Sequence, residues 1–177
     1  GGHVGETTTM ALIPQMVDAL DIPVIAAGGI ADGRGIAAAY MLGAQGVQAG
    51  TRFLVANECI VAQGYKDAII KAKDSSTVAT GRSTGHPVRI IKNKLARKIL
   101  SLEKQNAPEE EINQLCTGTL AAAVRDGDSD NGNIMSGQIA GLVKKEQPAA
   151  EIIEEMFKEV EEIYEDRNRI CRAGRTV

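Results

Sequence analysis

The sequence has no long apolar run, few cysteines and little net charge, and each of these absences excludes a class of protein. No apolar stretch reaches the roughly 18 residues that a membrane-spanning helix requires. The formal net charge is -3, which argues against a general nucleic-acid-binding surface. The three cysteines, Cys59, Cys116 and Cys171, lie far apart, which indicates reduced cytosolic thiols and neither a disulfide framework nor a metal site. We therefore expect no metal, no nucleic acid and no membrane as partners.

Length and composition are sufficient for a folded domain. The chain has 177 residues, of which 44% are hydrophobic, so a core can form and disorder is not expected. No secretory signal opens the sequence. We expect a cytoplasmic protein.

Two short apolar runs, each ending at a glycine turn, are the most informative feature of the chain. Val24–Ala27 precedes Gly28 and Gly29, and Val47–Ala49 precedes Gly50-Thr51, with a helical pattern of small residues between the runs. This order is typical of the end of a parallel α/β barrel, where the turns after strands seven and eight hold a phosphate group. Glycine N–H groups can approach phosphate oxygens closely because no Cβ intervenes, and a helix N-terminus behind the turn would favour the negative charge. Two turns without a ligand are the alternative, but their spacing of one strand–helix unit favours a shared phosphate site.

The remaining elements are expected from apolar periodicity. After Phe53 the alternation of strand and helix stops. We expect helices at residues 8–20, 33–42, 57–73, 88–102, 109–124 and 149–164, a short strand at 75–80, and a frayed tail from residue 167.

A glycine-rich loop opens the chain and carries His3. An imidazole changes its protonation state near neutral pH and can transfer protons, and the flanking glycines of Gly1-Gly2-His3-Val4-Gly5 would let it protrude toward a ligand. A surface histidine at a disordered end is the alternative. Because a functional loop normally hangs from a scaffold element, we expect the chain to be part of a longer protein.

Two further segments remain open from the residues alone. His86 precedes a proline and is held extended, which favours a structural role, and Arg89 is either an anion partner or an exposed side chain. Met135-Ser136-Gly137-Gln138 is a small-residue turn, which fits an active-site loop or a helix start equally well.

Taken together, these motifs resemble the FMN-dependent enoyl-acyl-carrier-protein reductases and their relatives, the nitronate monooxygenases (2-nitropropane dioxygenases). GGHVG at 1–5, PVIAAGGIADG at 23–33 and GVQAGTRF at 46–53 are shared by both branches. GHPVRIIKNKL at 85–95 and NIMSGQIAGLV at 133–143 resemble the reductase branch.

The resemblance implies an α/β fold, namely the C-terminal part of a TIM-like (β/α)8 barrel with a helical C-terminal extension. Residues 1–56 would supply the loop after strand six and strands seven and eight. Residues 57–177 would form the helical extension packed on the barrel, and the first six strands would lie outside this chain.

The resemblance also implies roles for individual residues. His3 would be the catalytic histidine, and no metal would be bound. FMN would contact Gly1, Gly2, Gly28, Gly29, Gln48, Gly50 and Thr51, and the substrate would contact Met135, Ser136 and Gln138.

The implied reaction is the FMN-dependent reduction of a trans-2-enoyl-acyl-carrier-protein thioester by NADH or NADPH in type II fatty-acid synthesis. Acyl carrier protein would be the partner, and the enzyme would be a homodimer in the bacterial cytoplasm. A nitronate monooxygenase, which uses FMN and oxygen, is the alternative within the flavoenzymes. A barrel that binds a phosphate ligand without redox chemistry is the alternative of another class.

Overall fold

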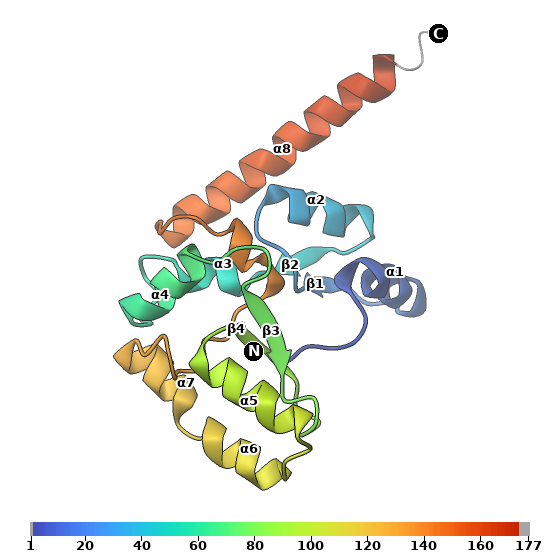
Figure 1. Ribbon diagram of the computed structural model, residues 1–177. Coiled ribbons are helices and arrows are strands. Elements are labelled where there is room, and N and C mark those ends of the chain that lie inside the picture. Colours follow the sequence, from blue (N-terminus) through green and yellow to red (C-terminus); the bar gives the residue numbers. More distant parts are fainter. Residues whose placement is uncertain (1, 174–177) are drawn as a thin grey trace. The chain divides into compact units, whose positions relative to one another are not determined.

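The computed structural model describes residues 2–173, with side chains up to residue 166. The chain is a mixed α/β protein with two compact units (Figure 1). The hairpin unit comprises Gly50–Gln147 and the residues up to Glu6. The parallel-strand unit comprises Thr7–Ala49 and the residues from Pro148. The expected division at residue 56, between the last barrel strands and a helical extension, stays a prediction.

The parallel-strand unit has the expected order of helix, strand, helix and strand. Its elements are α1 (Thr9–Ala19), β1 (Ile25–Ala27), α2 (Gly33–Met41), β2 (Gly46–Gln48) and α8 (Ala149–Ala173). The two strands pair in parallel, with Ile25 opposite Gly46 and Ala27 opposite Gln48. A parallel pair needs a crossover connection, which α2 provides.

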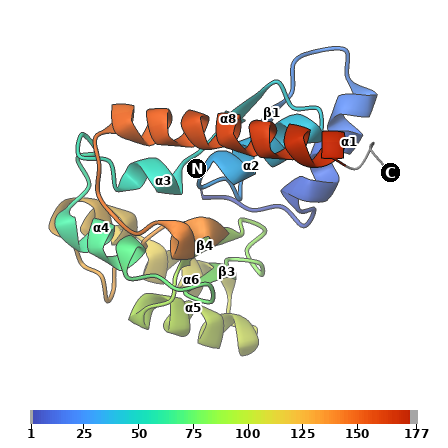
Figure 2. The same ribbon diagram turned by 90° about the horizontal axis from the view of Figure 1, so that it is seen from above.

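Helix α8 lies along α2 within this unit (Figure 2). Gly33 makes the close approach possible, because a Cβ at this position would lie 2.5 Å from the carbonyl oxygen of Met156. Each helix buries some of its apolar side chains, including Ile36 of α2 and Ile152 and Val160 of α8. The spacing of the α8 residues along one face is that of an amphipathic helix.

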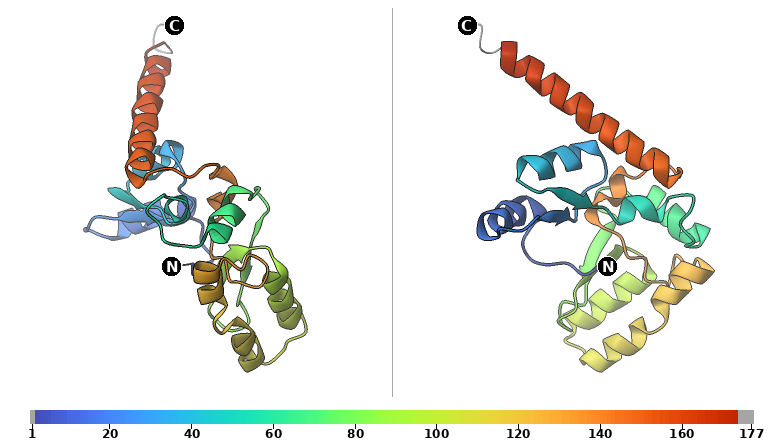
Figure 3. Two further views of the ribbon diagram at one scale, coloured as in Figure 1. Left: turned by 90° about the vertical axis from the view of Figure 1, so that its left-hand side faces the viewer. Right: turned by 180° about the vertical axis from the view of Figure 1, so that it is seen from behind.

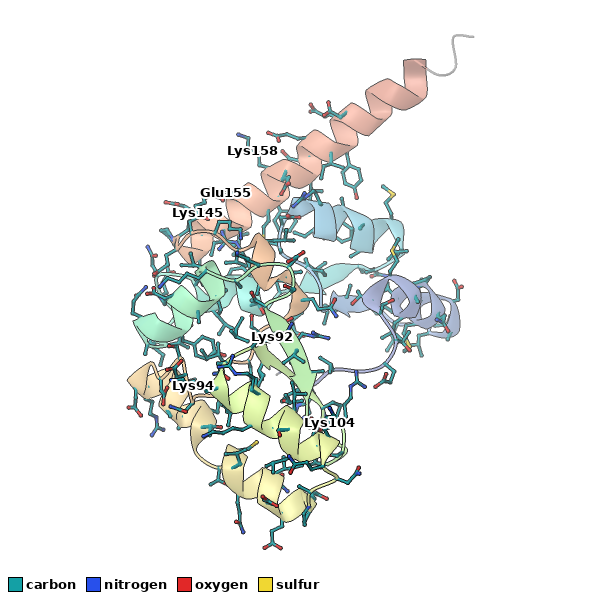
Figure 4. All side chains as sticks on the ribbon, in the orientation of Figure 1. Lys92, Lys94, Lys104, Lys145, Glu155 and Lys158 are labelled. Carbon is teal, nitrogen blue, oxygen red and sulfur yellow. The ribbon has the colours of Figure 1, made fainter. Side chains whose placement is uncertain are left out.

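The hairpin unit is built around two antiparallel strands. Its elements are α3 (Thr51–Leu54), α4 (Gln63–Ile70), β3 (Thr77–Thr80), β4 (Val88–Ile91), α5 (Lys94–Lys104), α6 (Glu109–Cys116), α7 (Thr119–Ala121), a π-helical turn (Ala122–Asp126) and a 3-10 turn (Gln138–Leu142). Helices α5 and α6 pack beside the hairpin (Figure 3). Ile90, Leu95, Ile99 and Ile112 form the buried core of this arrangement. Lys94 and Lys104 are exposed near the two ends of α5 (Figure 4).

The expected helix at 88–102 is wrong in its first part. Val88–Ile91 is strand β4, and α5 begins only at Lys94. Apolar residues at 88 and 91 fit a helical spacing with those at 95 and 99, but three of the four strand residues are β-branched and pair with β3. The Asn93 side chain then accepts a hydrogen bond from the Ala96 N–H at 2.9 Å and caps the new helix.

Other element boundaries also differ. The expected helix at 57–73 is confined to Gln63–Ile70. The expected helix at 109–124 is interrupted by Gly118, whose φ of 76° no helix residue adopts. Helix α8 continues through Ala173, so the expected fraying from residue 167 is wrong as far as the structure describes the tail. None of the described helices is both long and apolar enough to cross a membrane.

Candidate functional site

The first glycine turn has a backbone conformation that favours glycine. Gly28 and Gly29 have φ values of 97° and 77°, a region that L-residues with a Cβ rarely adopt. Both residues are exposed, and a Cβ built on Gly29 would meet no atom within 4 Å. The Thr9 hydroxyl donates to the Gly28 carbonyl oxygen at 2.9 Å and holds the turn. The turn is therefore open on the side where a ligand could approach.

The parallel pairing brings Gln48 to the same edge of the sheet as this turn. Ala27, which precedes the turn, lies opposite Gln48, and the carboxyl ends of parallel strands share one edge. The Gln48 side chain is exposed there. Three of the expected cofactor residues thus gather at one edge within the parallel-strand unit.

The second glycine turn follows β2 directly but belongs to the hairpin unit. Gly50 is exposed, has a φ of -99°, and would place a Cβ in open space. Thr51 begins the short helix α3. Because the two turns fall in different units, the convergence of their N–H groups on one phosphate stays a prediction.

The N-terminus of α2 is occupied by carboxylates of the protein. The Asp32 side chain accepts from the N–H groups of Arg34 (3.1 Å) and Gly35 (3.3 Å), and Glu159 of α8 accepts from the Gly33 N–H at 2.8 Å. Partial burial raises the pKa of Asp32, but the hydrogen bonds from Arg34 and Gly35 outweigh it and hold the pKa below its usual value. The first N–H groups of α2 are thus bound, so a phosphate would depend on the glycine turns and not on these donors.

His3 lies in the hairpin unit, on the edge of β4 that faces away from β3. It stands opposite Val88 in an antiparallel bridge. The Arg89 N–H donates to the Gly2 carbonyl oxygen at 2.9 Å, and the Val4 N–H donates to that of Pro87 at 3.0 Å. The His3 side chain is exposed, as expected for a group that meets a ligand. Gly1 lies outside the described residues.

The segment of residues 135–137 continues along the same edge of β4. Met135 stands opposite Ile90, and the Ser136 N–H donates to the Arg89 carbonyl oxygen at 3.1 Å. The backbone of Arg89 therefore binds the His3 loop through its N–H and the 135–137 segment through its carbonyl. A Cβ on Gly2 would lie 2.6 Å from the Met135 sulfur, so the two stretches are in direct contact. The structure brings the expected catalytic and substrate residues together.

Two hydroxyl groups from elsewhere in the unit anchor the 135–137 segment. The Gly137 N–H donates to Thr51 Oγ1 at 2.8 Å. The Tyr65 O–H donates to the Met135 carbonyl oxygen at 2.7 Å. Tyr65 is 2% exposed, and this burial raises its pKa to about 12, so the phenol stays protonated and able to donate at neutral pH.

Ser136 and Gln138 are positioned differently from one another. Ser136 is 4% exposed, and its hydroxyl has no hydrogen-bond partner in the part of the chain that the structure describes. Gln138 is exposed at the start of the 3-10 turn and lines a pocket of about 490 Å³ with Thr77 and Arg89. The Arg89 guanidinium donates to Thr77 Oγ1 at 3.2 Å. Arg89, whose role the sequence did not decide, therefore lies in the lining of this pocket together with its hydrogen-bond partner. His86 is exposed in the hairpin loop.

Sequence reasoning missed two residues of the site. Tyr65 acts on a carbonyl 70 residues away, and no local pattern marks such a contact. Thr9, the first residue of α1, bonds the Gly28 turn 19 residues away, and no local pattern indicates this contact. Among residues 2–166, no three histidine, cysteine or acidic side chains group as metal ligands.

Comparison with known sequences identifies relatives across most of the chain. The nitronate monooxygenase family profile matches residues 1–159. A probable nitronate monooxygenase from Staphylococcus saprophyticus is 41% identical over 174 residues, which cover 92% of this chain and 49% of that protein. One from Staphylococcus aureus is 37% identical over 176 residues, covering 93% and 49%. The chain therefore spans about half the length of these curated relatives.

Solved structures of related proteins have the same fold over most of this chain. FabK from Thermotoga maritima matches with a TM-score of 0.92 at 45% identity, covering 96% of this chain and 54% of that one. A nitroalkane oxidase from Streptomyces ansochromogenes matches with a TM-score of 0.73 at 30% identity, covering 92% and 49%.

Proposed function

The chain belongs to the nitronate monooxygenase family, and from this premise we propose that the protein is an FMN-dependent enoyl-acyl-carrier-protein reductase. The observation that carries the proposal is the similarity to FabK, an enoyl-acyl-carrier-protein reductase, at a TM-score of 0.92 and 45% identity. The nitroalkane oxidase is less similar in both measures. The family and FabK depend on flavin, which disfavours the alternative of a phosphate-binding barrel without redox chemistry.

The residues of the chain fit the phosphate end of FMN. At Gly29, and separately at Gly50 in the other unit, a Cβ would meet no atom within 4 Å, as a backbone contact to a phosphate requires. Gly28 and Gln48 would complete the contacts on one side. The Thr51 hydroxyl accepts a hydrogen bond from Gly137 and keeps its own hydrogen for a phosphate oxygen. Gly1 and Gly2 would border the flavin ring.

The bound cofactor would carry a hydride from NADH or NADPH to the β-carbon of a trans-2-enoyl thioester. The protein's own residues would orient the thioester and protect the site from water. Met135, Ser136 and Gln138 would contact the acyl chain and its thioester. The α-carbon needs a proton, which either His3 or solvent would supply.

Acyl carrier protein would deliver the thioester, and a homodimer in the cytoplasm would be the working form. None of these assignments depends on a metal. Each is inferred from the family resemblance and from the chemistry of the substrate.

A nitronate monooxygenase is the second candidate, because the staphylococcal relatives carry that name. In that reaction His3 would remove the α-proton of a nitroalkane, and oxygen would replace the nicotinamide as co-substrate. The same glycine turns would hold the phosphate of FMN in either enzyme.

Steady-state turnover of the full-length protein tests the proposal. We expect oxidation of NADH or NADPH that depends on a trans-2-enoyl thioester, and little oxygen consumption with a nitronate. Oxygen consumption with a nitronate and no thioester-dependent oxidation of either nicotinamide would assign the protein to the monooxygenases.

A further inference from the structure

We propose that Tyr65 and Thr51 fix the 135–137 segment in the geometry that presents Met135 and Ser136 to the substrate. Tyr65 is then a positioning residue, which acts through the backbone of Met135 and does not itself touch the reacting atoms. The kinetic part of this inference rests on the proposed function, whereas the structural part concerns the segment alone.

Tyr65 supplies the first anchor. It lies in α4, 70 residues from the group that it bonds, and its hydroxyl donates to the Met135 carbonyl oxygen at 2.7 Å. The side chain is 2% exposed, so water cannot readily replace the hydroxyl. Met135 itself is half-buried, and a shielded carbonyl that loses its donor is left partly unsatisfied, which destabilises the segment locally.

Thr51 supplies the second anchor, on the other side of Ser136. Its Oγ1 accepts from the Gly137 N–H at 2.8 Å, and the residue is 9% exposed. A hydroxyl can accept and donate at the same time, so the Thr51 hydrogen stays available to another acceptor. Thr51 is also an expected contact of the FMN phosphate, so one hydroxyl would connect the cofactor site to the substrate segment.

The two anchors act on a backbone that β4 also holds. The Ser136 N–H donates to the Arg89 carbonyl oxygen, so each of the three residues 135–137 has a main-chain group bonded to another element. Ser136 then has a fixed backbone, a buried side chain and a hydroxyl without a partner in the described chain. A polar group held in this way is poised to bond to a substrate, because buried hydroxyls without partners are unfavourable.

Hydrogen–deuterium exchange of the full-length protein tests the anchors directly. In Tyr65→Phe, we expect a peptide covering residues 133–138 to exchange about 5- to 100-fold faster, as removal of the donor from a partly buried acceptor predicts. Tyr40→Phe is the matched control, since it removes the same atom from a half-buried tyrosine in α2, for which the described residues show no hydroxyl bond. Unchanged exchange in Tyr65→Phe, or an equal change in Tyr40→Phe, would overturn the proposal.

Thr51 offers a second, independent variant. Thr51→Val removes the acceptor and should release the Gly137 amide, whereas Thr51→Ser keeps the hydroxyl and should restore protection. Equal exchange in the valine and serine variants would contradict the anchor.

The effect of Tyr65→Phe on the KM distinguishes a positioning role of Tyr65 from a purely structural one. We expect Tyr65→Phe to raise the KM for the thioester about 5-fold or more while flavin content stays unchanged and the midpoint of thermal unfolding falls only by the few degrees that one lost hydrogen bond predicts. An unchanged KM with faster exchange would overturn the positioning role. A failure of the proposed function would look different, because the wild-type protein would then not turn over the thioester at all.

Discussion

The Gly28-Gly29 turn of the parallel-strand unit and the 135–137 segment of the hairpin unit both contain expected site residues, but different forces hold them. The turn depends on backbone conformation, with positive φ at both glycines and one hydrogen bond from Thr9. The 135–137 segment has ordinary residues whose main-chain groups bond to Arg89, Tyr65 and Thr51. The turn should therefore be sensitive to any added Cβ, and the segment to the loss of single polar atoms elsewhere in its unit.

The largest effect is expected at the turn. Gly29→Val should abolish flavin retention in the full-length protein, because a side chain would occupy the open space that the phosphate needs and because φ is 77° there. Flavin absorbance of the purified protein measures the bound cofactor. Gly118→Val is the control, since φ is 76° and the space is also open there, away from the expected cradle. Equal loss of flavin in both variants would mean that strain, and not the ligand site, explains the result.

Gly50→Ala sharpens this test. Gly50 has a φ of -99° and open space around a Cβ, so alanine should fold without strain. A raised dissociation constant for FMN, measured by fluorescence titration of the apoprotein, is expected because the methyl group would lie between the N–H and the phosphate. Unaltered FMN affinity would remove Gly50 from the cradle.

The next largest effect concerns His3, on the same edge of β4 as the 135–137 segment. His3→Ala should lower turnover by about 100- to 10,000-fold if the imidazole acts as a general acid or base, and by less if it only orients the substrate. Flavin content should not change, because the expected phosphate contacts lie elsewhere in the sequence. His86→Ala should mainly affect the order of the hairpin loop. Full activity in His3→Ala together with loss of activity in His86→Ala would show that the wrong histidine was chosen.

A smaller effect is expected for Ser136→Ala within the segment itself. The variant should raise the KM about 2- to 10-fold, the value of one neutral hydrogen bond. Its free energy of unfolding should stay the same or rise, because the hydroxyl is buried without a partner and its removal leaves nothing unsatisfied. Kinetics and denaturant unfolding of the same preparation test both signs, and a destabilised variant would show that the hydroxyl has a structural bond.

The smallest effect is expected at Asp32, just after the turn. Asp32→Ala should cost about 0.5–2 kcal/mol at neutral pH, as loss of a helix cap does. The folded-state pKa of Asp32 lies below its usual value, so the contribution is present above the unfolded-state pKa and disappears as pH falls through the folded-state pKa. The charge-dependent part of the difference in unfolding free energy between wild type and variant should therefore shrink as pH falls below the unfolded-state pKa and disappear below the folded-state pKa. A difference that persists there would assign the loss to packing.

The contrast between a turn held by its own backbone conformation and a segment held by distant hydrogen-bond partners also explains which parts of the molecule the sequence could predict. The β1–α2–β2 unit and its glycine turn follow from local signals, namely an apolar run, paired glycines and Asp32 before a small-residue helix. His3 and the turn at Met135-Ser136 were candidates from the residues alone, but the choice between their functional and structural alternatives came from the family resemblance. Their position on one edge of Val88–Ile91 was not predicted, because the spacing of that strand also fits a helix. Tyr65 was not predictable, since nothing near it in the sequence points to a carbonyl 70 residues away.

An anaerobic spectral titration of the full-length flavoprotein tests the central claim most directly. We predict that NADH or NADPH bleaches the flavin absorbance without oxygen, and that a trans-2-enoyl thioester then restores it. A protein that holds flavin but is bleached by a nitronate and by neither nicotinamide would contradict the reductase assignment. A full-length protein that retains no flavin would contradict the site itself.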